Sequence, residues 1–344
     1  MGFQVSLQPG GSTFVVEAGE AVLDAALRAG CHIPYGCRGG SCGACAGRLL
    51  SGDYHYPQGL PPGLSPREAE TGRVLLCQAR ARSDLVFELH ELRMPPGIEV
   101  RTLPARVVSM QRLADDVMRL YLKLPASENF RYLAGQYVDI RLRGGGRRGF
   151  SIANRPGGED FLELHVRLVP GGEFTTHVFA EMKERAILRL QGPLGTFFVR
   201  EDSSRPLLMM AGGTGFAPLK AMIEQIYASG PHTRPVHLYW GARHRAGLYL
   251  HELVEGWIDA RPGLRYTPVL SEPLPEDDWR GRTGWVHEAL AADYPDLSGF
   301  DVYMSGPPAM VRAARERFAQ QGLPDGQLCF DAFEFAHTTS GNGE

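Results

Sequence analysis

The chain has 344 residues, of which 43% are hydrophobic and 22% charged, and its formal net charge is −3. A chain of this length is expected to form two or three domains with sizeable cores. The near-neutral charge gives no reason to expect nucleic acid as a partner, because nucleic acid calls for a basic patch. The longest apolar runs are too short to span a bilayer and no charged-then-apolar leader is visible, so we expect no membrane contact and a cytoplasmic location.

The first part of the chain predicts a small α+β unit. Alternating apolar residues on both sides of a Pro-Gly-Gly turn indicate a β-hairpin, and Ser65-Pro66-Arg67-Glu68 is a capping box that starts a helix. The other expected elements are a helix that Gly30 ends and two further strands. The predicted ranges are strands at 3–7, 13–16, 46–50 and 85–89 and a helix at 21–29.

A cysteine motif interrupts this unit. It reads Cys37-Arg38-Gly39-Gly40-Ser41-Cys42-Gly43-Ala44-Cys45, and Cys77 follows from a distant segment. This is the ligand spacing of a plant-type [2Fe–2S] cluster, in which a loop almost without side chains turns backbone N–H groups toward sulfur. Zinc sites favour two short-spaced cysteine pairs, and zinc or plain buried thiols are the weaker alternatives. The candidate metal ligands are Cys37, Cys42, Cys45 and Cys77.

The middle of the chain is rich in strand-like runs. They are short and fairly regularly spaced, and Gly and Pro turns separate them, which is typical of an antiparallel barrel. The runs span residues 105–109, 118–124, 136–142, 161–167 and 186–190.

Beyond residue 203, strands alternate with helices, which predicts a parallel sheet with helices on its faces. The expected strands are 207–211, 236–240, 266–270 and 302–305, with helices at 216–228 and 250–257. Gly212-Gly213-Thr214-Gly215 lies between the first strand and the first helix. Such a turn suits a pyrophosphate at a helix N-terminus, although a merely tight turn is the alternative and the spacing does not name the nucleotide.

Four motifs together resemble the ferredoxin-NADP reductase superfamily. They are Arg148-x-Phe150-Ser151, Gly213-Thr214-Gly215-x-Ala217-Pro218, Tyr239-Trp240-Gly241-Ala242-Arg243 and Gly306-Pro307-Pro308-x-Met310. With the cysteine motif in front, nearly the whole chain is similar to three-centre reductases of the CDP-6-deoxy-3,4-glucoseen reductase and phenol hydroxylase reductase type. The resemblance implies a β-grasp ferredoxin domain (1–92), a linker (93–100), an antiparallel FAD-binding β-barrel (101–202) and a parallel α/β pyridine-nucleotide-binding domain (203–344).

The resemblance also implies a flavin site. Arg148 would pair with the flavin pyrophosphate, a role that Arg147 takes if the register is shifted by one residue. Phe150 would stack on the isoalloxazine, and the Ser151 hydroxyl would lie near flavin N5.

A second flavin segment is implied at residues 170–175. Backbone N–H groups at Gly171 and Gly172 and the Thr175 hydroxyl would hold phosphate, although relatives commonly have serine where this chain has Thr175. The aromatic segment at 330–335 is either a final buried strand or a flavin contact, and we assign no flavin partner from it.

For the pyridine nucleotide, the resemblance implies that Gly213, Thr214 and Gly215 line the pyrophosphate. Gly306 and Pro307 would lie beside the nicotinamide. Ser305 stands where relatives usually have cysteine, so we expect activity to persist with an altered geometry or rate of hydride transfer. Arg243 would lie near the adenosine ribose. The resemblance favours NADH, and NADPH stays open because arginines suit a 2′-phosphate.

The implied function follows from electron counting. A nicotinamide delivers two electrons as hydride, whereas a [2Fe–2S] cluster accepts one, so FAD would receive the pair and release single electrons through the cluster. We expect a monomeric reductase whose partner is an external acceptor protein, either a dehydrase of the CDP-6-deoxyhexose type or an oxygenase component. The alternatives are direct reduction of a small molecule, such as free flavin or a ferric chelate, and a redox sensor without turnover.

Overall fold

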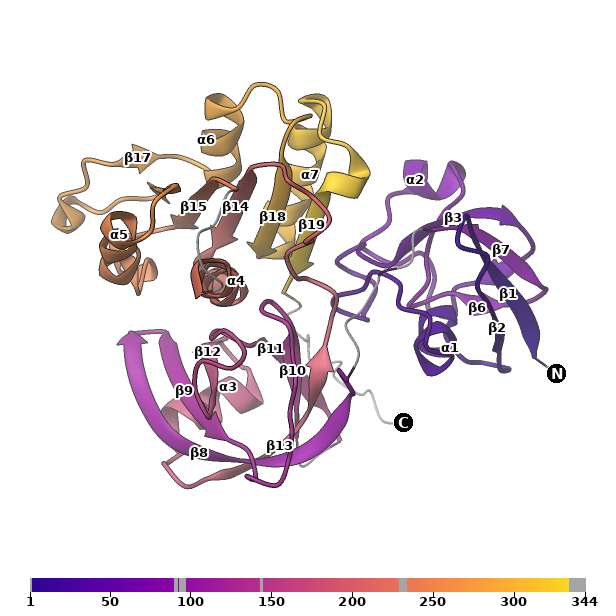
Figure 1. The fold of residues 1–344 in the computed structure, drawn as a ribbon, viewed down its shortest axis with the longest axis horizontal. Helices are drawn as coiled ribbons and strands as arrows, with labels where there is room; N and C mark the ends of the chain where they lie inside the picture. The colour runs from indigo at the N-terminus through magenta and orange to yellow at the C-terminus, as the bar shows by residue number, and fades with distance from the viewer. Residues whose placement is uncertain (1, 90–91, 93–96, 143–144, 229–233, 334–344) are drawn as a thin grey trace.

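A computed structural model describes residues 2–89, 92, 97–142, 145–228 and 234–333, so the predicted linker falls partly outside the described residues. Three large β-sheets organise the chain into an N-terminal unit, a barrel and a C-terminal α/β unit. The barrel and the α/β unit lie one above the other, and the N-terminal unit lies beside both (Figure 1). The predicted three-domain fold class is therefore confirmed.

The N-terminal unit is a five-stranded sheet in the order β2-β1-β7-β3-β5, with β1 and β7 parallel as in a β-grasp. The predicted hairpin, helix and capping box are present, and the Ser65 and Glu68 side chains each accept a hydrogen bond from the other's backbone N–H. The two-residue strands β4 and β6 were not expected. The bounds are β1 (Phe3–Gln8), β2 (Thr13–Val16), α1 (Val22–Arg28), β3 (Ala46–Ser51), β4 (Tyr54–His55), α2 (Pro66–Glu70), β5 (Arg73–Leu75), β6 (Arg80–Ala81) and β7 (Leu85–Glu88).

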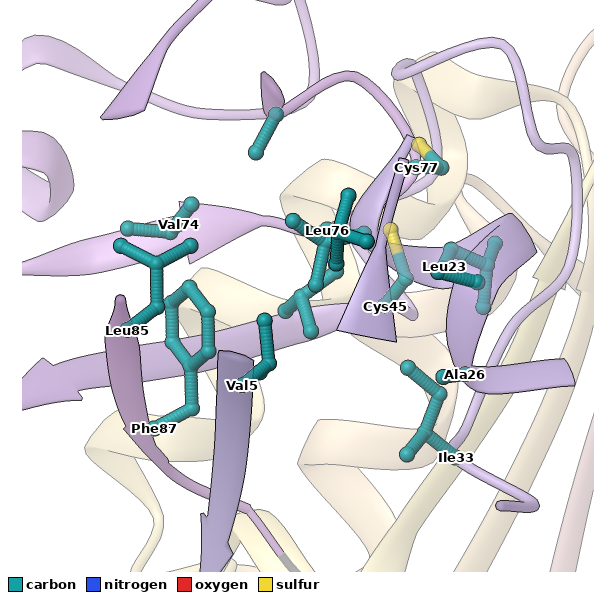
Figure 2. Packing of buried hydrophobic residues seen from close by; sticks show 14 of the residues in the cluster. Val5, Leu23, Ala26, Ile33, Cys45, Val74, Leu76, Cys77, Leu85 and Phe87 are labelled. Atoms are coloured by element: carbon teal, nitrogen blue, oxygen red, sulfur yellow. The ribbon is translucent and has the colours of Figure 1, made fainter. Parts of the chain in front are cut away.

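Two of the motif cysteines belong to the core of this unit. Cys45 and Cys77 are buried in the same hydrophobic cluster as Val5, Leu76 and Phe87. Figure 2 shows Cys45 between Leu76 and Leu23 and Cys77 above them, while Phe87 lies on the opposite side of the packed side chains. Burial of the surrounding apolar side chains therefore fixes the place of these two sulfur atoms.

The barrel is a six-stranded antiparallel sheet in the order β11-β10-β13-β8-β9-β12. A bridge between Ile152 and Leu164 joins its two edges, which closes the barrel. β8 is much longer than the predicted strand at 105–109, and two register shifts in its pairing with β9 let it bend around the core. The bounds are β8 (Arg101–Ala114), β9 (Val117–Lys123), β10 (Tyr137–Arg141), β11 (Arg147–Ser151), β12 (Leu162–Arg167), α3 (Glu173–Ala180) and β13 (Ile187–Leu194).

The C-terminal unit is a parallel sheet in the order β17-β16-β15-β14-β18-β19 with helices on both faces, as predicted. Alternate residues of β14 pack toward α4 and α5 on one face and toward α6 and α7 on the other, which explains why β14 is apolar throughout. The bounds are β14 (Leu207–Gly212), α4 (Phe216–Ala228), β15 (Val236–Ala242), α5 (His251–Ala260), β16 (Leu264–Leu270), β17 (Arg282–Thr283), α6 (Val286–Asp293), β18 (Asp301–Gly306), α7 (Pro308–Gln320) and β19 (Leu328–Ala332). Helix α4 lies between this sheet and the barrel (Figure 1).

No helix in the described part of the chain is long and apolar enough to cross a membrane.

The turn before α4 depends on a close backbone approach at Gly215. A Cβ on Gly215 would lie 2.0 Å from the Ser305 carbonyl oxygen, which belongs to the neighbouring strand β18. We expect Gly215→Ala to destabilise the C-terminal unit by about 1–3 kcal/mol because the backbone must shift. All four tryptophans lie in this unit, so urea unfolding followed by tryptophan fluorescence measures the loss.

The matched control is Gly256, which lies exposed in α5 with open space around its Cα. Gly256→Ala should stabilise the same unit by about 0.5–1 kcal/mol, because alanine loses less backbone entropy in a helix. Equal unfolding curves for Gly215→Ala and the unsubstituted chain would contradict the close approach.

Candidate functional site

The four motif cysteines come from two neighbouring segments. Cys37 and Cys42 lie on the loop after α1, Cys45 directly precedes β3, and Cys77 follows β5 closely. The backbone N–H of Leu76 donates to the Cys45 carbonyl oxygen at 3.1 Å, which holds the two segments together. The thiols form two interacting pairs, Cys37 with Cys42 and Cys45 with Cys77. The structure thus brings together all four predicted ligands.

The loop donates hydrogen bonds to sulfur. Backbone N–H groups of Gly39 and Cys42 point at Cys37 Sγ, and that of Ala44 points at Cys42 Sγ, each at 3.4 Å. Hydrogen bonding from the Cys42 thiol and from these backbone groups lowers the pKa of Cys37 to about 5, against the effect of burial. A loop that stabilises thiolate in this way fits an iron–sulfur cluster.

The donor set also fits that assignment. The four thiols form two interacting pairs, Cys37 with Cys42 and Cys45 with Cys77, and a cluster of two irons takes two sulfur ligands on each iron.

Backbone contacts insert the cysteine loop between the other two units. The Tyr35 N–H donates to Thr196 Oγ1 at 2.8 Å, and the Thr196 N–H donates to the Tyr35 carbonyl oxygen at 3.2 Å. The Tyr137 hydroxyl donates to the Gly36 carbonyl oxygen at 3.0 Å. Cys42 packs in the hydrophobic cluster of the C-terminal unit. The loop is therefore docked against both the barrel and the α/β unit.

A cavity of about 210 Å³ lies at the point where the three units meet. Its wall combines the cysteine loop, the barrel strands β10 and β11 and the end of β19. Ser151 and Arg148, which the sequence predicts as flavin contacts, share this wall with the predicted ligand Cys37. The lining residues include Cys37, Tyr137, Arg147, Arg148, Ser151 and Asp331.

Asp331 is a member of this site that sequence reasoning missed. Its carboxylate accepts a hydrogen bond from Ser151 Oγ at 3.4 Å. Burial, together with the nearby Cys37, raises the pKa of Asp331 to about 7, against the opposite effect of the hydrogen bond from Ser151. No local sequence pattern marks Asp331 as a site residue, because it reaches the cavity through the pairing of β19 with β18, where it lies opposite Ser305.

The other predicted flavin residues lie around β11. Arg148 and Arg147 both line the cavity, and Arg147 also lies 3.7 Å from Asp139. Phe150 does not line the cavity. Its ring packs 5.4 Å from the ring of Phe174 on α3, over the barrel core. The structure therefore brings the two arginines and Ser151 to the cavity and places Phe150 on the neighbouring barrel surface.

The second predicted flavin segment forms the start of α3, a helix that the sequence analysis did not predict. Gly171 has a φ of +74°, and Gly172 is the N-cap residue. Thr175 Oγ1 accepts from the Val169 N–H at 3.1 Å and so holds the turn that precedes the helix. A glycine turn followed by a helix N-terminus suits phosphate, while the role of the Thr175 hydroxyl stays a prediction.

The glycine turn of the C-terminal unit lies directly beside β18. Gly213, Thr214 and Gly215 form a buried turn between β14 and α4. Gly306, with a φ of +148°, approaches the Gly212 backbone so closely that a Cβ there would lie 3.0 Å from it. The predicted pyrophosphate turn and the predicted nicotinamide loop of Ser305, Gly306 and Pro307 are thus neighbours.

Three further residues lie near the carboxyl ends of the parallel strands. Ser305 is fully buried, and its Oγ has no hydrogen-bond partner. Arg243 is exposed after the carboxyl end of β15, away from the Ser151 cavity. Arg167, which sequence reasoning missed, extends from the barrel, and a Cβ on Gly213 would lie 2.5 Å from its guanidinium. Arg167 also pairs with Asp116, so the barrel places a guanidinium at the glycine turn.

Comparison with protein families divides the chain in the same way. A 2Fe-2S iron–sulfur cluster binding domain matches residues 5–82, an oxidoreductase FAD-binding domain matches residues 104–199, and an oxidoreductase NAD-binding domain matches residues 209–316. The predicted cofactors, a [2Fe–2S] cluster, FAD and a nicotinamide nucleotide, are thereby confirmed.

Similar proteins extend over nearly the full length. The chain is 39% identical to the CDP-6-deoxy-L-threo-D-glycero-4-hexulose-3-dehydrase reductase of Yersinia pestis, over 97% of this chain and 99% of that protein. It is 36% identical to the phenol hydroxylase P5 protein of Acinetobacter pittii, over 94% and 92%. The crystal structure of the Amycolatopsis cytochrome P450 reductase GcoB is similar with a TM-score of 0.77 and 33% identity, over 96% of this chain and 98% of that chain.

The unpartnered Ser305 hydroxyl generates a prediction. We expect Ser305→Cys to remain active but to change the rate constant of flavin reduction by NADH, because sulfur is larger and more polarizable than oxygen. Anaerobic stopped-flow absorbance measures this rate. Ser305→Ala is the control for loss of the hydroxyl alone, and it should raise stability, since an unsatisfied buried hydroxyl costs about 1–3 kcal/mol. An unchanged rate and charge-transfer band in Ser305→Cys would remove this residue from the reaction.

Proposed function

The chain belongs to the iron–sulfur flavoprotein reductases of the ferredoxin-NADP reductase superfamily, and we propose that the cavity between Cys37, Ser151 and Asp331 is its electron-transfer site. The enzyme is an NAD(P)H-dependent oxidoreductase. One observation supports the assignment above all others: a predicted cluster ligand and the predicted flavin-contacting serine share one cavity wall.

The bound groups would supply the redox chemistry. NAD(P)H supplies two electrons as hydride, FAD accepts the pair, and the [2Fe–2S] cluster accepts electrons one at a time. Cys37, Cys42, Cys45 and Cys77 would hold the cluster. Arg148 or Arg147 would bind the flavin pyrophosphate together with Gly171, Gly172 and Thr175 at the N-terminus of α3.

The protein's own contribution at the cavity is to orient groups and to hold a proton. Ser151 Oγ can donate either to Asp331 or to a group bound in the cavity, because its hydrogen bond to Asp331 is long at 3.4 Å. Asp331, with its raised pKa, is able to carry a proton at Oδ2 near neutral pH. The docked cysteine loop forms one wall of this cavity.

For the nicotinamide nucleotide we propose a path along the carboxyl edge of the parallel sheet. Gly213, Thr214, Gly215 and Arg167 would meet the pyrophosphate, Ser305, Gly306 and Pro307 the nicotinamide, and Arg243 the adenosine ribose. NADH is the proposed donor on the strength of the family resemblance. A ratio of kcat/KM for NADH over NADPH below one would overturn this preference.

The proposed acceptor is a second protein, of the dehydrase or oxygenase kind that the similar reductases serve by name. Coverage of more than nine tenths of both chains supports the transfer of this role. The experiment is anaerobic reduction with NADH followed by stopped-flow mixing with candidate acceptor proteins. Faster oxidation by free flavin or ferric chelates than by any protein would favour the small-molecule alternative. Failure to oxidise NADH with ferricyanide would favour the redox sensor.

We further propose a monomer in the cytoplasm, where NAD(P)H is supplied, with domain boundaries at 1–92, 101–202 and 203–344. The family matches lie inside all three ranges and support these limits.

The cluster assignment yields a prediction that separates the two halves of the reaction. Cys42→Ser should lose the visible absorbance and the electron paramagnetic resonance signal of the cluster. It should still reduce its FAD with NADH, since the barrel and the α/β unit are unchanged, while electron transfer to cytochrome c falls strongly. Cys31→Ala is the control, because Cys31 is buried in the same unit and is not a predicted ligand. A cluster with unchanged absorbance and electron paramagnetic resonance spectra in Cys42→Ser would contradict the ligand assignment, because an oxygen ligand from serine would alter both spectra.

A further inference from the structure

A buried ammonium group joins the α/β unit to the barrel. Lys220 lies on α4 and is only 4% exposed. Its Nζ donates to the Ala153 carbonyl oxygen at 3.0 Å and to Glu163 Oε2 at 3.0 Å, both in the barrel. It also lies 2.9 Å from Glu224 Oε1 on its own helix. All three N–H donors of the ammonium group therefore have an acceptor.

A second contact crosses the same interface. The other oxygen of Glu163 lies 2.8 Å from His165 Nε2, and His165 Nδ1 lies 2.9 Å from the hydroxyl of Tyr249, which belongs to the α/β unit. Burial alone would raise the pKa of Glu163. The hydrogen bond with His165 and the charge of Lys220 outweigh this effect and lower the pKa of Glu163 to about 2. The Glu163 carboxylate thus stays ionised and holds both crossing contacts in one network.

Both contacts lie close to residues that are proposed to bind the flavin or the nicotinamide nucleotide. On the barrel side, Ala153 is two residues beyond Ser151, whose side chain lines the cavity. On the other side, α4 begins directly after the Gly213–Gly215 turn. The ring of Tyr249 packs edge-on against Trp240 at 5.2 Å, and Trp240 Nε1 donates to the Gly213 carbonyl oxygen at 2.9 Å.

The surroundings show why this network matters for alignment. A groove of about 770 Å³ between the barrel and α4 and α5 has Lys220, Glu163 and Glu224 in its wall. The two units are therefore not closed by apolar packing on this side. A buried ion pair adds little net stability compared with apolar packing, but its hydrogen bonds fix direction and distance.

We propose that Lys220 and Tyr249 are positioning residues that set the approach of the nucleotide turn to the Ser151 cavity, and thereby the geometry of hydride transfer. The inference rests on the proposed hydride transfer to flavin at that cavity. Hydride transfer needs the reacting atoms about 3–3.5 Å apart, and a displacement of about 1 Å can cost a hundredfold in rate. The cluster step does not cross this interface, because the cysteine loop is docked through Tyr35 and Tyr137 instead.

The test uses FAD- and cluster-loaded protein. Tyr249→Phe deletes one hydroxyl, and Lys220→Met combined with Glu163→Gln removes both charges without leaving either unpaired. The matched control is Glu224→Gln, which changes an acceptor of the same ammonium group inside its own unit. Anaerobic stopped-flow absorbance measures the Kd of NADH, the rate constant of flavin reduction and the charge-transfer band, and then the rate of cluster reduction.

We expect the double variant to reduce flavin at least about tenfold more slowly, with a weaker charge-transfer band. Tyr249→Phe should show a smaller loss in the same direction. The Kd of NADH and the intrinsic rate constant of electron transfer from reduced FAD to the cluster, fitted as a separate step after flavin reduction, should stay within about twofold, since the nucleotide turn and the cysteine loop are intact. Glu224→Gln should match the unsubstituted enzyme.

Two results would overturn the inference. One is a folded, FAD-loaded double variant that reduces flavin at the original rate. The other is a proportional fall in FAD retention, NADH affinity and both rates, which would mean a structural role only. Absence of flavin reduction by NADH in the unsubstituted enzyme would instead contradict the proposed function, so the two failures are distinguishable.

Discussion

The docking of the cysteine loop against the barrel by hydrogen bonds at Tyr35 and Gly36 is the constraint on which the rest of the structure depends. Tyr35 and Thr196 exchange bonds across the boundary between the N-terminal unit and the barrel, and Tyr137 donates to Gly36. Each of these bonds uses a backbone group of the loop, so together they hold the loop beside Tyr137 of β10 and beside Thr196, which follows β13 closely. Cys37 consequently lies in the same cavity wall as Ser151.

The C-terminal strand completes this cavity for a related reason. β19 pairs with β18, and its register places Asp331 opposite Ser305. The same register brings the Asp331 carboxylate within 3.4 Å of Ser151 Oγ. A single strand therefore links the edge of the parallel sheet proposed for the nucleotide to the wall of the cavity proposed for the flavin. The Asp331 carboxyl group is buried in this wall, and its burial explains why its pKa is raised.

Sequence reasoning succeeded where the signal was local. The cysteine spacing, the capping box at Ser65 and the apolar run of β14 each depend on neighbours in the chain, and the structure contains all three. It failed where placement depends on distant pairing. Asp331 and Arg167 reach their sites only through strand register.

The missed elements have the same origin. β11 is rich in arginine and glycine and becomes a strand because β10 pairs with it. Helix α3 follows a glycine turn that suggests a loop, and its formation depends on packing of Phe174 against Phe150 and the barrel core. Tertiary contacts thus decided the local structure where propensity was weak.

The barrel has two interfaces whose chemistry differs in a way that matches what each must do. The cluster is a resident group, so the interface between its loop and the barrel can be closed by hydrogen bonds such as those between Tyr35 and Thr196. The nicotinamide nucleotide enters and leaves in every turnover, and the interface beside its turn borders a water-accessible groove. Packing alone cannot fix the geometry of an interface that must remain open to solvent nearby. Directional bonds from a buried ammonium group to a carbonyl and a carboxylate can do so, because their strength falls steeply when distance or angle changes.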